Sequence, residues 1–137
     1  MSSRGFSEIV LIVEDVPRAA EFYEHVVGLE LEHHTGEWAW FFAAKGDRKQ
    51  RLAVHRGPLM FEEHSPHPEG ERFGHVHFAF DVAREDLAAA VERVRAAGVD
   101  VWGPVELDWM DAQSYYFYDP DGNLLEFWSP ESDRRRA

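Results

Sequence analysis

Four ionisable side chains stand where the sequence otherwise predicts hydrophobic strands. Glu126 lies in the apolar run LLEFW, and Glu8 opens the β-branched run EIVLIV. His55 lies in the run LAVHR, and His75 opens the run HVHFAF. A carboxylate enclosed by apolar walls must shift its pKa or pair with another group, and a bound dication removes that conflict. Two carboxylates and two imidazoles therefore form a suitable ligand set for a divalent transition metal with open coordination positions.

The turn that precedes Glu126 determines which way this carboxylate points. The segment DPDGN separates two runs of aromatic and aliphatic residues, which predicts a β-hairpin. Asp119 suits the first position of a type I turn, Pro120 the second, and Gly122 the left-handed residue that follows. Because side chains alternate between the faces of a strand, a one-residue slip would move Glu126 to the opposite face.

The first half of the chain predicts a strand followed by a helix. Residues 7–15 form a short β-branched run, and residues 16–28 follow with boundary signals at both ends. Asp15 is a suitable N-cap, Pro17 lies in the first turn, and Gly28 stands where a terminating glycine is expected. One apolar stripe has the spacing i, i+3, i+4 and i+7 and consists of Ala19, Phe22, Tyr23 and Val26.

The second half repeats this pattern, with a strand over 74–82 and a helix over 84–98 whose apolar stripe is Leu87, Ala90, Val91 and Val94. Three further strands are expected after each helix, at 29–35, 37–44 and 50–57 and at 99–109, 112–119 and 123–130. The sequence therefore predicts an α+β fold of two βαβββ modules in a single domain. Module one spans 6–57, an exposed linker spans 58–74, and module two spans 75–130.

The strands are apolar on both faces, so we expect one face of each sheet to pack on its helix and the two sheets to curl into a cup. The repeat then places Glu8 and His75 on the first strand of each module. It places His55 and Glu126 on the last strand of each module. Alternation puts all four on the cup face. His77 shares that face with His75 and is an alternative ligand, or a side chain that orients one.

Each of these residues also has a simpler interpretation. A single histidine in a strand is more often hydrogen-bonded or partly exposed than bound to a metal, and Glu8 is close enough to the N-terminus to be solvated. Trp38 and Trp40 lie on one face of a strand, which is typical of a core but also suits the wall of a ligand cleft. The repeat of positions is what favours the metal site.

Composition narrows the class of protein. The 137 residues carry 14 Lys and Arg against 26 Asp and Glu, which argues against a nucleic-acid partner. The chain has no cysteine, which excludes disulfides, thiolate metal sites and cysteine nucleophiles. No apolar run reaches the length of a membrane span and no signal-peptide pattern is present, so we expect a cytoplasmic protein without a membrane partner.

Three stretches together resemble the vicinal oxygen chelate superfamily, which includes glyoxalase I, fosfomycin- and bleomycin-resistance proteins and extradiol dioxygenases. They are IVLIVEDVPRAAEFYEHVVGLEL, HVHFAFDV with its helix ending in RAAGV, and YFYDPDGNLLEF. The resemblance spans nearly the whole chain. It implies paired βαβββ modules in a U-shaped cup (the glyoxalase-like fold), a homodimer, and a metal held by the first and last strands of each module.

Carried over by position, the resemblance assigns the ligands Glu8, His55, His75 and Glu126. Glu8 stands where histidine is usual, and His55 stands where a carboxylate is usual, so the donor set is unchanged and suits Zn²⁺, Ni²⁺, Mn²⁺ or Fe²⁺. The implied function is lyase- or isomerase-type chemistry on a small molecule that chelates the ion through two oxygens, with Glu126 or Glu8 as the base. The alternative is a metal-free, bleomycin-resistance-like protein that binds a cationic aromatic compound in an acidic, tryptophan-lined cleft.

Overall fold

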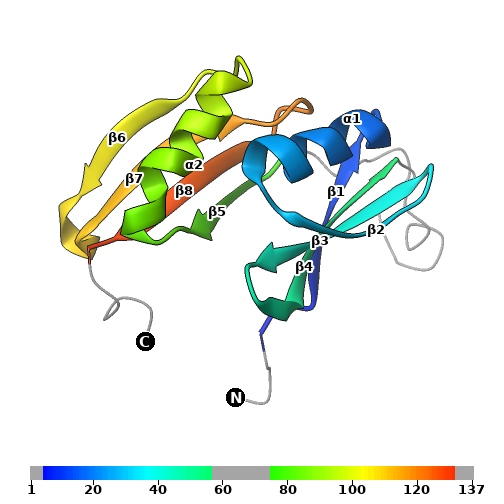
Figure 1. Ribbon diagram of the computed structural model, residues 1–137, viewed down its shortest axis with the longest axis horizontal. Helices are drawn as coiled ribbons and strands as arrows, with labels where there is room; N and C mark the ends of the chain where they lie inside the picture. Colours follow the sequence, from blue (N-terminus) through cyan, green and yellow to red (C-terminus); the bar gives the residue numbers. More distant parts are fainter. Residues whose placement is uncertain (1–4, 57–74, 132–137) are drawn as a thin grey trace, which may run out of the picture. The chain divides into compact units, whose positions relative to one another are not determined.

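Each half of the chain folds as a strand, a helix and three further strands, in a computed structural model that describes residues 5–56 and 75–131 (Figure 1). The chain divides into two units, Met1–Gly74 and His75–Ala137, and each described sheet has four strands. The predicted α+β class with two βαβββ repeats is confirmed. The predicted linker 58–74 lies outside the described residues.

The first unit contains β1 (Glu8–Val13), α1 (Val16–Glu21), the π-helix η1 (Phe22–Val27), β2 (Glu30–His34), β3 (Trp38–Ala44) and β4 (Asp47–Arg56). Its strand order is β1-β4-β3-β2. The first strand runs parallel to β4, and the other neighbours are antiparallel. Because β4 lies beside β1, the two strands expected to carry Glu8 and His55 are direct neighbours.

The predicted boundaries of the first helix are confirmed, but its buried stripe shifts by one residue. The Asp15 carboxylate accepts a hydrogen bond from the backbone N–H of Arg18 at 3.0 Å, and Gly28 ends the helix with φ of 91°. The second half of the helix is π-helical, and Val27 is buried while Val26 is only half-buried. A π-helix has a wider turn than an α-helix, so the residue that follows Tyr23 on the core side comes one position later than predicted.

The second unit contains β5 (His77–Asp81), α2 (Arg84–Ala96), β6 (Trp102–Leu107), the short 3₁₀ helix η3 (Asp108–Met110), β7 (Ala112–Tyr118) and β8 (Leu124–Pro130). Its strand order, β5-β8-β7-β6, is equivalent to that of the first unit. The predicted stripe on α2 is confirmed, since all four of its residues are buried. The fifth strand starts at His77, so His75 precedes it.

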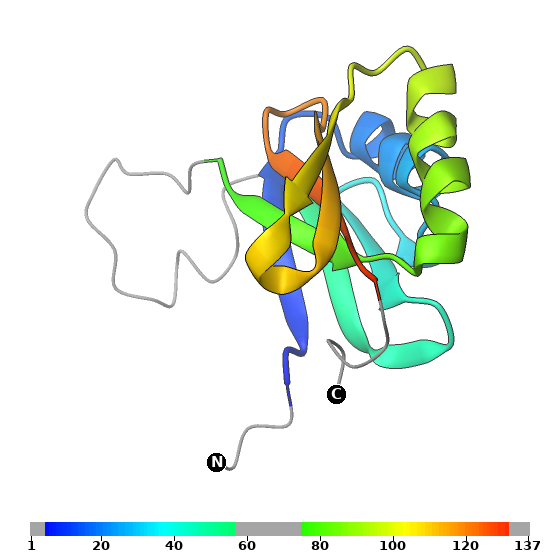
Figure 2. The ribbon, with the colours of Figure 1, turned by 90° about the vertical axis from the view of Figure 1, so that its left-hand side faces the viewer.

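Each helix covers one face of its own sheet, as Figure 2 shows for α2. In the first unit the buried face includes Leu11, Ala39, Phe41, Leu52 and Val54, and the ring centre of Tyr23 lies 6.0 Å from that of Phe41. In the second unit it includes Phe117, Leu125 and Phe127, and the rings of Phe117 and Phe127 meet edge to face at 4.8 Å. We call the opposite side of each sheet its open face. Side chains that alternate with these core residues lie there.

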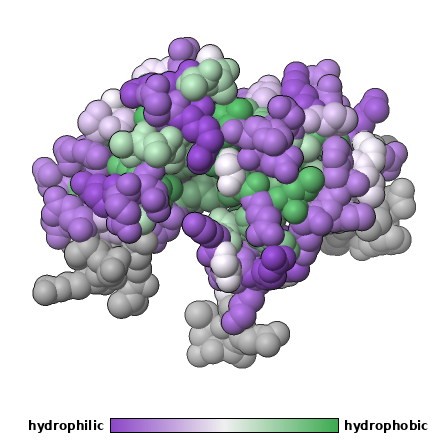
Figure 3. Space-filling view, viewed as in Figure 1, coloured by the Kyte–Doolittle hydropathy of each residue, from purple (hydrophilic) through white to green (hydrophobic). Residues whose placement is uncertain are grey.

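Polar side chains cover most of the face that Figure 3 shows, as expected from a chain in which 29% of the residues are charged. Within the described residues, no helix combines the length and the apolar character needed to cross a bilayer.

The turn between β7 and β8 is held by its own side chains. The carboxylate of Asp119 is buried and accepts hydrogen bonds from the backbone N–H groups of Asp121 (2.9 Å) and Asn123 (2.8 Å) and from the Asn123 amide (2.9 Å). Gly122 has φ of 89°, the left-handed conformation predicted for it. The Asn123 side-chain oxygen accepts a hydrogen bond from the backbone of Val76 at 3.0 Å. The turn is therefore tied directly to the residue that precedes β5.

Candidate functional site

Glu126 lies at the centre of a polar cluster on the open face of the second sheet. The register pairs Glu126 with Ala79 on β5 and with Tyr116 on β7. Its Oε1 atom is 3.2 Å from Nε2 of His77, and its Oε2 atom accepts a hydrogen bond from the Ser114 hydroxyl at 2.5 Å. Glu126 is only 7% exposed. The charge noted in the sequence is therefore a buried carboxylate with a partner for each oxygen.

The orientation of His77 leaves one ring nitrogen available as a ligand. Its Nδ1 atom is 3.0 Å from the backbone carbonyl of Leu124, which can only accept, so Nδ1 carries a hydrogen. A neutral ring then directs the lone pair of Nε2 at the Glu126 carboxylate, and a proton or a cation must lie between these two acceptors. Two atoms that each bind one ion at about 2.1 Å are roughly 3.0–3.5 Å apart in octahedral or tetrahedral geometry. The separation of 3.2 Å between Nε2 and Oε1 fits such a pair.

Tyr116 and Ser114 complete the cluster from β7. Burial, and then the negative charge of Glu126, raise the pKa of the Tyr116 phenol. Its ring centre is 6.2 Å from that of His77. A protonated phenol and a hydroxyl thus stand beside the carboxylate, and both can donate hydrogen bonds at the site.

The structure brings His77, rather than His75, to Glu126. A Cβ built on Gly122 would lie 3.1 Å from Cε1 of His75, so this ring packs on the turn glycine. His77 pairs with Leu124 in the register and contacts Glu126. Two residues that are two positions apart in a strand share a face, but His75 precedes β5, so the alternation of that strand does not extend to it.

Glu8 and His55 share the open face of the first sheet, as predicted, but they lie apart. The register pairs Glu8 with Arg51 and Ile12 with His55. Because a strand rises about 3.3 Å per residue, their Cα atoms are about 13 Å apart along the sheet. Side chains stand roughly perpendicular to a sheet, so these two are not brought to one ion in this unit.

The starts of β1 and β5 give a second alignment of the two repeats. Glu8 and His77 are the first residues of these strands. If these two residues are aligned, their partners are Arg51 and Leu124, and Ala53 takes the place equivalent to Glu126 in the first unit. This alignment differs by two residues from the predicted one, in which His55 is equivalent to Glu126. The two alignments keep the same face and differ in the place along the strand.

His55 instead belongs to a stack of aromatic rings. It is 6% exposed, and its ring centre is 4.0 Å from that of Trp38, which stacks on Trp40 at 4.8 Å and 5°. Its Nδ1 atom is buried and has no hydrogen-bond partner among the described residues. Burial lowers the pKa of His55, and the charge of Glu37 opposes this only in part.

We expect the lowered pKa of His55 to make the protein less stable as the pH falls. Above the usual histidine value of 6.5 the residue is neutral in both states and has no pH-dependent effect. Below it, the unfolded chain binds a proton that the folded state resists, so the free energy of unfolding falls until the pH reaches the folded pKa. Urea unfolding midpoints at several pH values between about 5.5 and 7.5 should show a smaller pH dependence in His55→Phe. His34→Gln, at an exposed position, is the matched control, and an unchanged profile in His55→Phe would contradict the argument.

Among residues 5–56 and 75–131, no three His, Asp or Glu side chains are gathered as a complete metal centre. His77 and Glu126 are therefore a pair of donors rather than a full coordination sphere. Zinc and iron sites usually take at least three protein ligands, so a metal site built on this pair would need a third ligand from another element.

Sequence reasoning missed Ser114 and Tyr116, although the hairpin contained the signal for both. Once the DPDGN turn fixes Tyr118 opposite Leu124, Tyr116 must lie opposite Glu126, and Ser114 is the next residue on that face. Counting back from a predicted turn would have found them.

Comparison with known proteins identifies the family. The chain is 28% identical over 123 residues to glutathione transferase FosA of Serratia marcescens, covering 90% of this chain and 79% of the relative. It is 29% identical over 123 residues to metallothiol transferase FosB of Shouchella clausii, covering 89% and 77%. A solved structure from the mobile metagenome of V. Pseudocholerae superposes with a TM-score of 0.72 at 29% identity, covering 96% of this chain and 98% of that one. A family model matches residues 5–127, and the chain belongs to the Glyoxalase/Bleomycin resistance protein/Dioxygenase superfamily.

Proposed function

We propose that this protein is a metal-dependent enzyme that acts on a small molecule which presents two oxygen atoms to the ion. The observation that supports this most is the 3.2 Å approach of His77 Nε2 to Glu126 Oε1, with Nδ1 of the same ring facing the Leu124 carbonyl. These are the distances and the tautomer that a pair of metal ligands needs. His77 replaces His75 in the proposed ligand set.

Glu8 is the proposed third ligand. It is exposed on the open face of its sheet and stands at the strand position equivalent to His77. One imidazole and two carboxylates suit Mn²⁺, Fe²⁺, Ni²⁺ or Zn²⁺. Glu8 comes from the same chain or from the second copy in a homodimer. The names of the relatives agree with an enzyme, since FosA is a glutathione transferase and FosB a metallothiol transferase.

The side chains divide the chemistry between them. A bound divalent ion would act as a Lewis acid on the substrate oxygens. The Ser114 hydroxyl holds Oε2 of Glu126 and leaves Oε1 toward His77. The Tyr116 phenol, whose pKa is raised, stays protonated at neutral pH and donates a hydrogen bond where negative charge develops on the substrate. A carboxylate of Glu8 or Glu126 accepts the proton, which favours lyase- or isomerase-type chemistry.

Metal analysis tests the proposal. The purified protein is expected to contain one equivalent of a divalent metal, which a chelator removes and which the same metal restores. Thermal unfolding should shift upward with added metal, because a ligand that binds the folded state stabilises it. A protein that takes up none of Mn²⁺, Fe²⁺, Ni²⁺ and Zn²⁺ would rule out the metal-dependent enzyme.

The second candidate function, a metal-free binding protein for a cationic aromatic compound, is favoured by one observation. Trp38 and Trp40 are stacked, half-buried and on the open face of the first sheet. Aromatic faces attract cations and flat rings. Quenching of tryptophan fluorescence by an aromatic cation, unchanged by a chelator and found in a protein without metal, would favour this function over the enzyme.

A further inference from the structure

A cleft of about 580 Å³ opens in the first unit where β1 and β4 begin, whereas His55 lies near the other end of β4. Its lining consists of Gly5, Phe6, Ser7, Arg48, Lys49 and Arg51. Three of these six residues are cationic, and none is acidic. In a chain with 26 acidic and 14 basic residues, a cleft wall of this composition is unusual. The cleft has the size of a small-molecule site.

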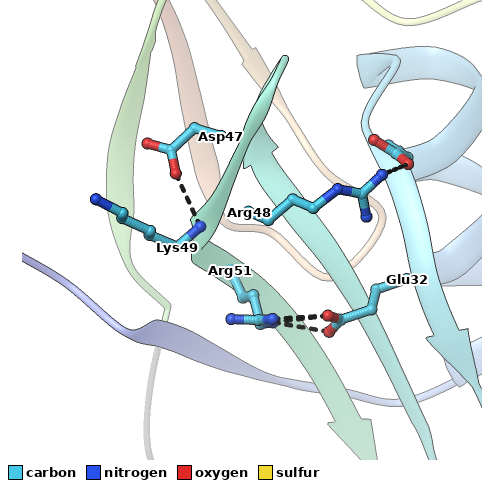
Figure 4. A network of polar contacts seen from close by, with 6 residues as sticks. Glu32, Asp47, Arg48, Lys49 and Arg51 are labelled. Carbon is cyan, nitrogen blue, oxygen red and sulfur yellow. Dashed lines mark hydrogen bonds and ion pairs between the residues drawn. The ribbon is translucent and has the colours of Figure 1, made fainter.

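The two arginines are held in place from one side, as Figure 4 shows for Arg51. Arg51 donates through Nε and Nη2 to the Glu32 carboxylate at 2.8–3.0 Å. Arg48 donates through Nη2 to Glu30 at 3.1 Å. Both guanidinium groups also lie over the ring of Phe42, at 4.6 and 5.3 Å from its centre. These contacts fix the orientation of each guanidinium. The Nη1 group of each arginine stays out of the ion pair, so it is a donor that is already oriented for a ligand.

Lys49 supplies a charge that no carboxylate among residues 5–56 and 75–131 neutralises. Its backbone N–H donates to the Asp47 carboxylate at 2.8 Å, which fixes the start of its side chain. Its ammonium group has no ion-pair partner in the part of the chain that the structure describes, and Figure 4 shows it extending away from Glu32. The other wall of the cleft, residues 5–7, is attached to β4, because the backbone N–H of Arg51 donates to the Ser7 carbonyl at 3.0 Å.

We propose that this cleft binds an oxyanion group, a phosphate or a carboxylate, of a small ligand. The Nη1 groups of Arg48 and Arg51, which lie outside the ion pairs with Glu30 and Glu32, can donate to the oxygens of such a group, and the Lys49 ammonium adds a positive charge. Phe6 is 69% exposed and offers an apolar surface to the rest of the ligand.

The position of the cleft links it to the proposed metal site. Arg51 is the direct neighbour of Glu8 in the β1–β4 register, and the two share the open face. A ligand held by Arg51 and Lys49 would therefore place its oxyanion next to the third proposed metal ligand. This role as a substrate subsite rests on the proposed function, whereas binding of an oxyanion in the cleft does not.

Titration with inorganic phosphate and with acetate, at low ionic strength, tests the site. Binding would be followed by backbone amide chemical shifts, in protein as purified and after chelator treatment. We expect shifts at residues 5–7 and 48–51 with at least one of the two anions. Lys49→Gln should weaken that binding about 10-fold, since it removes one charged contact. Lys45→Gln is the matched control, because it removes the same charge from the exposed turn between β3 and β4.

The outcomes separate this inference from the proposed function. Anion binding that survives the chelator and is lost with Lys49→Gln supports the cleft, whether or not the protein binds metal. The cleft is ruled out if neither anion shifts residues 5–7 and 48–51, if Lys45→Gln weakens binding as much as Lys49→Gln, or if the chelator abolishes binding. Arg51→Lys keeps the charge but removes the Nη1 donor that lies outside the ion pair with Glu32, and it should also weaken binding.

Discussion

His77→Ala is expected to lower the affinity of the protein for a divalent metal by about 100-fold or more, while His75→Ala leaves it nearly unchanged. Loss of a residue that only orients a ligand already lowers metal affinity about 10- to 100-fold, so loss of a ligand should do at least as much. His77 lies 3.2 Å from Glu126, whereas the ring of His75 packs on Gly122. Competition with a chromophoric chelator would measure both affinities.

The two variants control each other, since each removes one imidazole from the same short stretch of chain. Circular dichroism and unfolding midpoints would verify that both are folded. If His75→Ala loses the metal and His77→Ala retains it, the site described here is wrong and the assignment made from the sequence alone is right. Glu126→Gln keeps the shape of the side chain and removes a charge, and its metal affinity should fall together with that of His77→Ala.

The order of strands and helices could be predicted because each boundary has a local chemical cause. Asp15 caps a helix, Gly28 ends it, and DPDGN turns the chain, and these signals act within a few residues. The change to a π-helix over Phe22–Val27 had no such signal. It shifted the buried residue from Val26 to Val27.

The place of each site residue along its strand was harder to predict than its face. The face on which a strand side chain lies follows from the two-residue alternation of the strand, which can be read directly from the sequence. Position along the strand depends on register with a neighbour, and β1 and β5 pair with strands that are distant in the sequence. The assignments of His75 and His55 were both made across such parallel pairs. Tyr116 lies across a tight hairpin from Glu126, so its position could have been predicted from the sequence.

The DPDGN turn that precedes Glu126 also positions its partner, His77. Asp119 holds Asn123 by two hydrogen bonds, and Asn123 holds the backbone of Val76, the residue before His77. Two strands that pair in parallel have no tight loop between them, so a side-chain bridge of this kind helps to fix their register. The spacing between His77 and Glu126 therefore depends on a carboxylate that is not itself part of the cluster.

Asp119→Ala is accordingly expected to lower the free energy of unfolding by about 2–4 kcal/mol. The substitution removes three hydrogen bonds to a buried carboxylate and leaves the Asn123 amide buried without that partner. Each such bond stabilises a protein by about 1 kcal/mol, and an unsatisfied buried donor costs about 1–3 kcal/mol. Urea unfolding, with the slope of the transition compared between variants, would measure the loss.

Asp100→Ala, which changes an exposed aspartate in the loop after α2, is the matched control and should alter stability by less than about 0.5 kcal/mol. Asp119→Asn should fall between the two, because its amide oxygen still accepts from the backbone while its NH₂ group meets that of Asn123. At a temperature where Asp119→Ala remains folded, its metal affinity should also drop, since the bridge to Val76 is weakened. A variant that keeps full stability, or that loses stability with no change in metal affinity, would show that the turn does not position His77 against Glu126.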